Sequence, residues 1–379
     1  MSKAVTEPYT RPLPEVQEIL LQRIQQKRVP LEFTDPGVSE RIVRGLSSLD
    51  HGEWADAFGA AAVPHRERAE QAEADGDEVA ARREWQLAWA YEAVAHYPAP
   101  RTDPKRRAYE RARDAFRRLA PLLEPPAEPV AIPYPGRPGE GSSIPAYLRR
   151  PAPTPTPAPV PILLIWGGID TYKERVTLGV EPYLDAGLAV LSFDMPGVGE
   201  APVAGSESAE RMWDAVFAWT DEHPEFDRNR VGFLGRSAGG YWSTKLVHTH
   251  PDLVRAAVNH GGMIHHYFTP EGIDRAQRSE YPYEHGETMA HAFGIESYAE
   301  WVDFAPRLSL LEQGVLDGPC APLLLVHGTK DSFIPIEDHY LLLEHGSPKH
   351  ARFFPTGHMG WTPQTEPTIR DWLVGMLTS

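Results

Sequence analysis

The first third of the chain carries apolar residues at helical spacing. Within residues 14–123 they recur every three or four positions, so they fall on one face of an α-helix. The clearest stripes are Val16, Ile19, Leu20 and Ile24, followed by Ile42, Val43, Leu46 and Leu49. No run in this part alternates as a strand would. The pattern therefore predicts a region built of amphipathic helices.

The last two predicted helices of this region, Glu78–His96 and Asp103–Leu119, are separated by the turn Pro98-Ala99-Pro100. The pair resembles one tetratricopeptide-like hairpin. A repeat solenoid needs about three such units to be stable, and the sequence holds no second copy at the required period. We therefore expect residues 1–125 to form a helical cap region ahead of a second domain. A free-standing helical interaction module is the alternative, and it would explain residues 14–123 only.

After Glu124-Pro125-Pro126 the pattern changes to short apolar runs separated by helical segments. Such alternation is typical of a mostly parallel β-sheet with helices on both faces. The runs are Val130–Pro133, Ile144–Leu148, Ile162–Trp166, Ala189–Phe193, Val231–Leu234, Ala256–Asn259, Leu323–Val326 and Arg352–Phe354. Residues 126–379 are therefore expected to form an α/β domain with an eight-stranded sheet.

Two segments interrupt this alternation. The sequence PAPTPTPAPVP, residues 151–161, would be a polyproline-type linker in many proteins. Here we expect an exposed loop, because the strands before it need those after it to complete a sheet. Residues 263–318 carry Tyr, His and acidic residues in short helical patterns such as Ile295–Phe304. They predict a lid inserted after the sixth strand.

Composition and charge narrow the function. The chain has 379 residues, a formal net charge of −16 and a single cysteine, Cys320. The negative charge opposes binding to a phosphate backbone, so nucleic acid is not an expected partner. No apolar run approaches the roughly 18 residues of a membrane span, and the N-terminal MSKAVTEPYTRPLP lacks the apolar stretch of a signal peptide. A single cysteine also allows no intrachain disulfide. These features together lead us to expect a cytoplasmic protein that does not bind membranes.

A nucleophile motif, G-x-S-x-G, stands in the segment Val231-Gly-Phe-Leu-Gly-Arg-Ser237-Ala-Gly-Gly-Tyr. It lies between an apolar strand and the amphipathic helix Tyr241–His248. In a sharp strand-to-helix turn the serine hydroxyl is exposed at the carboxyl edge of the sheet, and small neighbours permit the close backbone approach. A glycine turn with an incidental serine is the plainer interpretation. The flanking elements favour Ser237 as a nucleophile.

A serine nucleophile needs a base to take its proton and an acid to hold that base. Asp331 lies in the turn after the strand Leu323–Gly328, at the carboxyl end of that strand. Capping of a helix at Ile336–Leu343 is the alternative role for this carboxylate. His358 lies in a loop after Arg352–Phe354 and is flanked by glycines. Among the sixteen histidines it alone combines a loop position with the chain order Ser, Asp, His.

The tetrahedral intermediate of such a reaction needs two hydrogen-bond donors aimed at its oxyanion. One is expected to be the N–H of Ala238, directly after the nucleophile. The other is expected from the glycine turn after the third strand, from the N–H of Ile169 or Gly168. A purely structural turn is the alternative at this second position.

Two further loops give the chain a family resemblance. Together with the triad residues, Gly167-Gly-Ile-Asp-Thr-Tyr-Lys-Glu174 and Asp194-Met-Pro-Gly-Val-Gly-Glu200 resemble one branch of the α/β-hydrolases. This branch holds the FrsA-like esterases, the 2,6-dihydroxypseudooxynicotine hydrolase and the fungal yellowish-green pigment hydrolases that shorten polyketides. The similarity covers nearly the whole chain, because these proteins also carry a helical region ahead of the hydrolase domain. The elbow and the His-Gly-x-x-Asp segment are superfamily-wide, whereas the combination of both loops with the helical front is more specific.

The resemblance implies an α/β-hydrolase fold, a Ser-Asp-His triad without metal or cofactor, a small-molecule substrate and often a homodimer. Several members of the branch cleave a carbon–carbon bond next to a ketone in a 1,3-dicarbonyl or polyketide-like substrate. A carbon leaving group must be protonated, and the predicted lid offers His265, His266, Tyr267 and Glu271 without singling out one donor. We take His265, His266 and Tyr267 as candidate substrate-binding residues.

Three histidines close together also admit a metal-site interpretation. His260, His265 and His266 lie within seven positions, but no carboxylate or cysteine follows at a recognised ligand spacing. Pocket lining or lid packing is therefore favoured, and no metal site is predicted.

The acidic and basic residues of the two family loops have plainer interpretations as well. We expect Asp194 and Glu200 to order their loop by hydrogen bonds, and Lys173 and Glu174 to form a solvated helix start. Arg236, beside the nucleophile, is expected to pair with Asp194 or Glu200.

The predicted activity is hydrolysis of a small or medium ketone- or ester-bearing metabolite, with carbon–carbon cleavage as one form of it. A simple esterase, a thioesterase or an acyl-transferring cyclase of secondary metabolism would use the same residues. A binding protein that kept the fold without catalysis is the alternative from another class.

Overall fold

The computed structural model describes residues 7–153 and 159–379. The N-terminal residues 1–6 and the centre of the predicted loop at 151–161, residues 154–158, lie outside the described residues. Contacts divide the chain into two compact units. A helical unit comprises Thr10–Glu128 and Pro282–Glu284, and a sheet unit comprises Pro129–Tyr281 and His285–Ser379 with a short N-terminal piece that ends at Tyr9.

The helical unit contains the helices that the apolar spacing predicts, and the described residues of this unit before β1 form no strand. Its helices are α1 (Leu13–Gln26), α2 (Pro36–Gly45), α3 (His51–Ala74), α4 (Glu78–Ala95) and α5 (Asp103–Leu119), followed by the short 3₁₀ helix η1 (Ala120–Leu122). Three of them begin at carboxylate caps, because Asp35, Asp50 and Asp77 accept backbone hydrogen bonds from the first turns of α2, α3 and α4. These short side chains satisfy amide groups that helix geometry leaves without partners.

Three residues of the predicted lid, Pro282–Glu284, pack in the helical unit. The Tyr283 ring lies 5.1 Å from that of Trp54, and its hydroxyl lies 3.2 Å from the buried ammonium of Lys105. Burial lowers the pKa of Lys105 to about 7. The carboxylate of Glu284 pairs with Nε2 of His51 at 2.7 Å. Nothing in the local sequence pattern indicates this placement.

The sheet unit is built on one eight-stranded sheet, as the alternation of apolar runs predicts. The strands are β1 (Glu128–Pro133), β2 (Ser143–Arg149), β3 (Val160–Trp166), β4 (Ala189–Phe193), β5 (Phe226–Arg236), β6 (Ala256–His260), β7 (Leu323–Gly328) and β8 (Lys349–Phe354). Their order is β1-β2-β4-β3-β5-β6-β7-β8. β2 pairs antiparallel with β4, and the strands from β4 across to β8 pair in parallel. The carboxyl ends of these parallel strands therefore meet at one edge.

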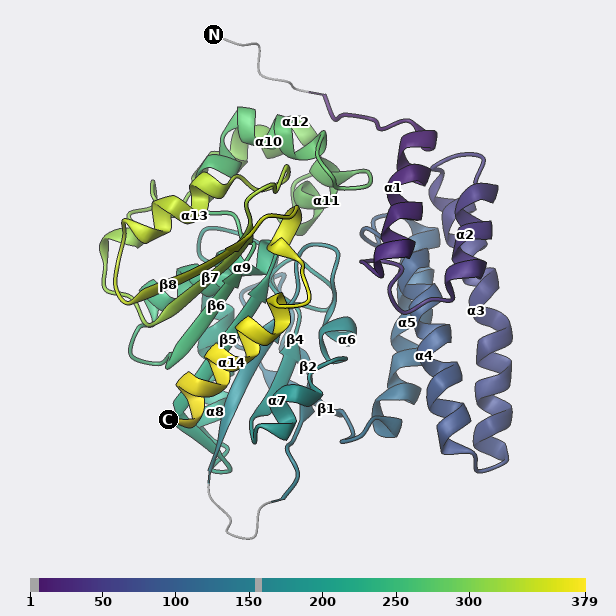
Figure 1. Cartoon of the computed structure of the whole chain (residues 1–379), viewed down its shortest axis with the longest axis horizontal. Helices are drawn as coiled ribbons and strands as arrows, with labels where there is room; N and C mark the ends of the chain where they lie inside the picture. Colours follow the sequence, from purple (N-terminus) through teal and green to yellow (C-terminus); the bar gives the residue numbers. More distant parts are fainter. Residues whose placement is uncertain (1–6, 154–158) are drawn as a thin grey trace. The chain divides into compact units, whose positions relative to one another are not determined.

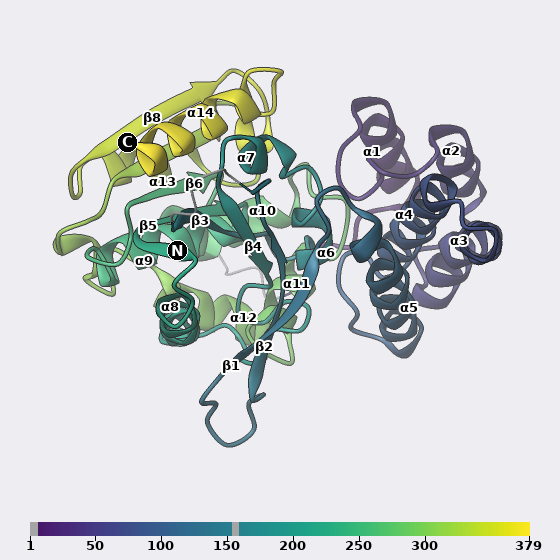
Figure 2. The same cartoon turned by 90° about the horizontal axis from the view of Figure 1, so that it is seen from below.

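The helices that follow strands β3, β4, β5, β7 and β8 cover both faces of the sheet (Figures 1 and 2). They are α6 (Lys173–Val176), α7 (Glu181–Asp185), α8 (Met212–Asp221), α9 (Ala238–Thr249), α13 (Ile336–Leu343) and α14 (Thr365–Thr378). Among the described residues no helix is both long and apolar enough to cross a membrane.

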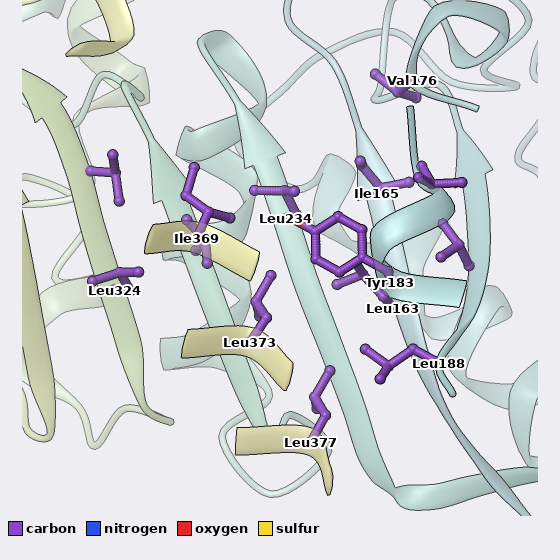
Figure 3. Packing of buried hydrophobic residues seen from close by; sticks show 14 of the residues in the cluster. Leu163, Ile165, Val176, Tyr183, Leu188, Leu234, Leu324, Ile369, Leu373 and Leu377 are labelled. Atoms are coloured by element: carbon purple, nitrogen blue, oxygen red, sulfur yellow. The ribbon is translucent and has the colours of Figure 1, made fainter. Parts of the chain in front are cut away.

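Alternation along the strands gives each face its own core. Leu234 of β5 points to the face that α7 and α14 cover, where it shares one buried cluster with Ile369, Leu373 and Leu377 of α14 (Figure 3). The preceding residue, Phe233, points to the opposite face and packs against Trp166 at 5.5 Å between ring centroids. Trp213 of α8 continues this aromatic layer. Both layers are buried, so β5 is packed on both faces immediately before Ser237.

The segment after β6 forms the predicted set of short helices. They are η3 (His266–Phe268), α10 (Pro270–Gln277), α11 (His285–Ala292), α12 (Tyr298–Phe304), η4 (Ala305–Leu308) and η5 (Val315–Asp317). Figure 1 shows the green helices α10, α11 and α12 gathered beside one end of the sheet. We call the segment of residues 263–318 the lid.

Candidate active site

Ser237 occupies the sharp turn between β5 and α9. Its backbone adopts φ 52° and ψ −127°, a conformation that a residue with a side chain rarely takes. The turn is tight enough that a Cβ at Gly235 would lie 2.2 Å from the carbonyl oxygen of Gly239. Glycine is therefore required there, as the motif G-x-S-x-G predicts. The Ser237 N–H donates to the carbonyl of His260 at the end of β6, at 2.8 Å, which ties the turn to the neighbouring strand.

The three residues of the predicted triad lie in one hydrogen-bonded line. Oγ of Ser237 lies 2.8 Å from Nε2 of His358, and Nδ1 of His358 lies 2.7 Å from Oδ2 of Asp331. The serine turn and the histidine loop are 121 positions apart in the sequence. They meet because β5, β7 and β8 end at the same edge of the sheet. This geometry suits a general base on one ring nitrogen and an orienting acid on the other.

The side chain of Asp331 is fully buried and is ordered by its own turn. Its Oδ1 accepts hydrogen bonds from the N–H groups of Phe333 at 2.8 Å and Ile334 at 2.9 Å. Burial raises the pKa of this carboxyl, but His358, His327 and the N–H of Ile334 together lower it further, so the pKa lies below its usual value. The residue just before helix α13 is Pro335, so Asp331 does not cap that helix. The alternative role weighed for this carboxylate is thereby wrong.

The loop after β3 lies directly against the nucleophile. A Cβ at Gly168 would be 3.0 Å from Cβ and 3.3 Å from Oγ of Ser237. The indole N–H of Trp166 donates to the carbonyl of Gly239 at 2.8 Å, which fixes the loop relative to the start of α9. Ala238 is the first residue of that helix, where backbone N–H groups have no partner within the helix. These positions agree with the expected oxyanion donors, and their role stays a prediction.

The family loops after β3 and β4 are joined by a buried ion cluster. Nζ of Lys173 lies 2.9 Å from Glu174, 3.2 Å from Asp194 and 2.7 Å from Glu200. Asp194 also accepts the backbone N–H groups of Lys173 and Glu200, as expected of a loop-ordering residue. The expected solvated helix start is wrong, because Lys173 and Glu174 are only 2% exposed. Their charges are paired in three dimensions rather than hydrated.

Arg236 pairs with a residue that the sequence did not single out. Its guanidinium makes two hydrogen bonds to Glu366 of α14, at 2.7 and 3.0 Å, and not to the acids of the family loops. The expected pairing with Asp194 or Glu200 is therefore wrong. The two partners are 130 positions apart, so no local pattern could have linked them.

A buried carboxylate on α13 anchors the start of the lid. Asp338 is fully buried and accepts the backbone N–H groups of Ile264, His265 and His266 at 2.9, 3.1 and 2.6 Å. Nδ1 of His266 lies 3.1 Å from the same carboxylate, which raises the pKa of this half-exposed histidine. Nδ1 of His265 pairs with the hydroxyl of Ser309 at 2.7 Å. The substrate-binding role of these two histidines stays a prediction.

Tyr267 belongs to a buried aromatic group beside the triad. Its hydroxyl lies 2.6 Å from Nε2 of His285, whose ring is 4.5 Å from that of Phe333. Phe333 in turn packs edge-on against His358 at 4.9 Å. Burial, with a further contribution from His358, lowers the pKa of His285 to about 3, so this imidazole is neutral. The sequence pattern pointed to Tyr267 but gave no signal for His285 or Phe333.

The histidines considered as metal ligands do not converge. Nε2 of His260 lies 2.7 Å from the carbonyl oxygen of Met359, whereas His265 and His266 contact Ser309 and Asp338. Over the described ranges, no group of three or more His, Cys, Asp or Glu side chains is arranged to hold a metal ion.

The sheet topology, the strained serine turn and the hydrogen-bonded line define an α/β-hydrolase. A family model described as "Esterase FrsA-like" matches residues 39–356, so the chain belongs to the FrsA-like family. The predicted fold, the predicted branch and the prediction of an α/β-hydrolase enzyme are thereby confirmed.

Individual relatives agree with this family. The α/β-hydrolase ucsC of Acremonium sp is 30% identical over 220 residues, which are 53% of this chain and 45% of that protein. The 2,6-dihydropseudooxynicotine hydrolase of Paenarthrobacter nicotinovorans is 30% identical over 215 residues, 55% of each chain. The match thus spans about half the length of these relatives. The crystal structure of a 2,6-dihydroxy-pseudo-oxynicotine hydrolase superposes with a TM-score of 0.76 at 22% identity, covering 93% of this chain and 95% of that one, and shows the same fold.

Proposed function

We propose that the protein hydrolyses a small or medium ketone- or ester-bearing metabolite, with Ser237 as nucleophile, His358 as general base and Asp331 as the orienting acid. The line of hydrogen bonds from Ser237 through His358 to Asp331 carries this proposal. His358 removes the hydroxyl proton while the serine oxygen attacks the substrate carbonyl carbon. The N–H groups of Ala238 and of Gly168 or Ile169 then stabilise the oxyanion.

The preferred substrate class is a 1,3-dicarbonyl or polyketide-like compound, because members of the resembling branch cleave a carbon–carbon bond next to a ketone. In that reaction the tetrahedral adduct collapses, the bond to the neighbouring carbon breaks, and the electron pair leaves as a carbanion stabilised by the second carbonyl. The proton that His358 took from Ser237 is passed on to the carbanion, which becomes the neutral ketone and leaves His358 unprotonated. Water then hydrolyses the acyl-serine ester with His358 as base. Simple ester or thioester hydrolysis uses the same steps with an oxygen or sulfur leaving group. In a cyclase, a hydroxyl of the substrate takes the place of water and accepts the acyl group.

The decisive experiment measures turnover of a 1,3-diketone series and a p-nitrophenyl ester series by wild type and by Ser237→Ala. We expect the wild type to release a ketone and a carboxylate from a diketone and the variant to lose turnover of every substrate. A variant as active as the wild type would overturn the assignment of Ser237. Release of products from esters alone would favour the esterase alternative.

Labelling with a fluorophosphonate separates catalysis from mere binding. An activated serine reacts with this probe, so stoichiometric labelling of wild type and none of Ser237→Ala is expected. A folded wild-type protein that is not labelled would favour the non-catalytic binding protein. The cytoplasmic location and the homodimer stay predictions; a molecular mass in solution of twice that of the chain would support the latter.

A further inference from the structure

The backbone around His358 is held from two opposite sides by side chains outside the triad. Its N–H donates to Oε1 of Glu280, a lid residue between α10 and α11, at 2.8 Å. The carbonyl of the next residue, Met359, lies 2.7 Å from Nε2 of His260 at the end of β6. We propose that Glu280 and His260 are positioning residues that together hold Nε2 of His358 within reach of the Ser237 hydroxyl.

His260 is built to donate to Met359. Nη1 of Arg236 lies 3.0 Å from Nδ1 of His260, and a guanidinium can only donate, so Nδ1 accepts and Nε2 carries the proton. Bonds to Glu366 fix Arg236 in turn. Burial and the charge of Arg236 lower the pKa of His260 to about 3, which keeps this single tautomer over the working range of pH.

The same residue also contacts the nucleophile. The backbone carbonyl of His260 accepts the N–H of Ser237 at 2.8 Å, while its side chain reaches Met359. One residue at the end of β6 thus links the serine turn to the histidine loop. Met359 has φ 66°, a left-handed conformation that costs free energy without external support, and the hydrogen bond from His260 supplies such support.

Glu280 contacts both the loop that carries His358 and the loop that carries Asp331. Besides accepting from His358, it donates its own backbone N–H to the hydroxyl of Ser332, next to Asp331, at 3.3 Å. The chain leaves room for this carboxylate, because a Cβ at Gly357 would lie 2.7 Å from Oε1 of Glu280. The Glu280 carboxylate thus fits closely against Gly357, which brings the lid into direct contact with the histidine loop.

The lid and the catalytic histidine are connected through one carboxylate, so the alignment of the base depends on the placement of the lid. Displacing a catalytic group by about 1 Å can cost on the order of 100-fold in rate. Substrates that seat the lid correctly are therefore expected to be turned over fastest. This inference rests on the proposed function, because it assigns to His358 the role of general base.

The test uses the full-length protein and five variants: Ser237→Ala, Glu280→Ala, Glu280→Gln, His260→Phe and the matched control Glu300→Gln, an exposed lid carboxylate. Each is assayed with a p-nitrophenyl ester for kcat and KM and with a fluorophosphonate for the rate of Ser237 labelling. We expect Glu280→Ala and His260→Phe to lower kcat and the labelling rate roughly 10- to 100-fold, with KM within about threefold. Glu280→Gln keeps an acceptor oxygen and should recover most of both rates, whereas Glu300→Gln should match wild type.

The outcomes separate this proposal from the proposed function. Activity of Ser237→Ala would overturn both. An inactive Ser237→Ala with a Glu280→Ala variant that equals wild type in kcat and labelling overturns the positioning role alone. A Glu280→Gln variant as slow as Glu280→Ala also contradicts it, because the acceptor oxygen would then not matter. Thermal unfolding of each variant controls for misfolding, and Glu280 keeps the test open should His260→Phe fail to fold.

Discussion

Oδ2 of Asp331 lies 2.7 Å from Nδ1 of His358, while Oδ1 of the same carboxylate accepts the N–H groups of Phe333 and Ile334. Both oxygens are therefore fixed by separate partners. The carboxylate cannot rotate without losing hydrogen bonds in a fully buried place, where an unpaired polar group costs about 1–3 kcal/mol. Asp331 thus selects the tautomer of His358 in which Nδ1 carries the proton and Nε2 faces Ser237.

Replacing Asp331 by Asn should preserve the shape of the site and lose most of the activity. The amide NH₂ can donate to Nδ1 and so stabilise the wrong tautomer, which removes the base from the serine. We expect kcat to fall on the order of 10³- to 10⁴-fold with little change in KM. Steady-state kinetics on Asp331→Asn and on the exposed control Asp252→Asn test this. A kcat within tenfold of wild type would contradict the assigned role.

Gly168 should not tolerate even one methyl group. Its Cβ would be 3.0 Å from Cβ of Ser237, so either the serine or the loop that carries the second oxyanion donor must shift. Loss of one such donor typically costs about 10²- to 10³-fold in kcat, and we expect Gly168→Ala to lie near this range.

The matched control is Gly375→Ala in α14, where an added Cβ meets nothing within 4 Å. It should keep wild-type kinetics. Wild-type kinetics for Gly168→Ala would show that the loop after β3 moves freely and does not stabilise the oxyanion.

The contrast between predicted and unpredicted residues has a physical basis. Apolar periodicity, the glycines around Ser237 and the positions of Asp331 and His358 after strands are local signals, and the parallel sheet brings strand ends together by itself. The contacts of Glu280 with His358 and of Arg236 with Glu366 join segments that are 78 and 130 positions apart. No short-range pattern encodes such pairs.

Polarity misled the sequence interpretation where charges pair inside the protein. Lys173 and Glu174 read as a hydrated helix start, because charged neighbours usually lie at the surface. Their burial depends on Asp194 and Glu200 from the next loop, and a single sequence does not reveal which distant charges meet.

This ion cluster predicts an unequal effect of removing its members. Lys173→Met would leave the buried Asp194 and Glu174 and the partly exposed Glu200 without their cation, and breaking a buried pair in this way costs roughly 3–5 kcal/mol. Glu200→Gln removes only the most exposed carboxylate and should cost far less. Urea unfolding of both variants and of the double variant measures the difference. The prediction fails if Lys173→Met is less than about 1 kcal/mol below wild type.

A final prediction concerns acid stability. His339 of α13 stacks on His327 of β7 with ring centroids 4.0 Å apart, and both rings are fully buried. Neither ring nitrogen of His339 has a hydrogen-bond partner among the described residues. Burial, and next the neighbouring His327, hold the pKa of His339 well below its usual value. This imidazole therefore stays neutral in the folded protein under conditions where the unfolded chain protonates it.

Below about pH 6.5 the unfolded state binds a proton at His339 that the folded state does not, so the free energy of unfolding falls by about 1.4 kcal/mol for each pH unit lost. In His339→Phe this contribution is gone, and the phenyl ring can keep the stack. We expect stability at pH 7 within about 1 kcal/mol of wild type, and a loss between pH 7 and pH 5 smaller by roughly 2 kcal/mol. Denaturant unfolding at both pH values measures this difference in stability, with His350→Phe at an exposed position as control. An identical loss of stability in wild type and in His339→Phe would contradict the prediction, because His339 would then take up its proton in the folded protein as well.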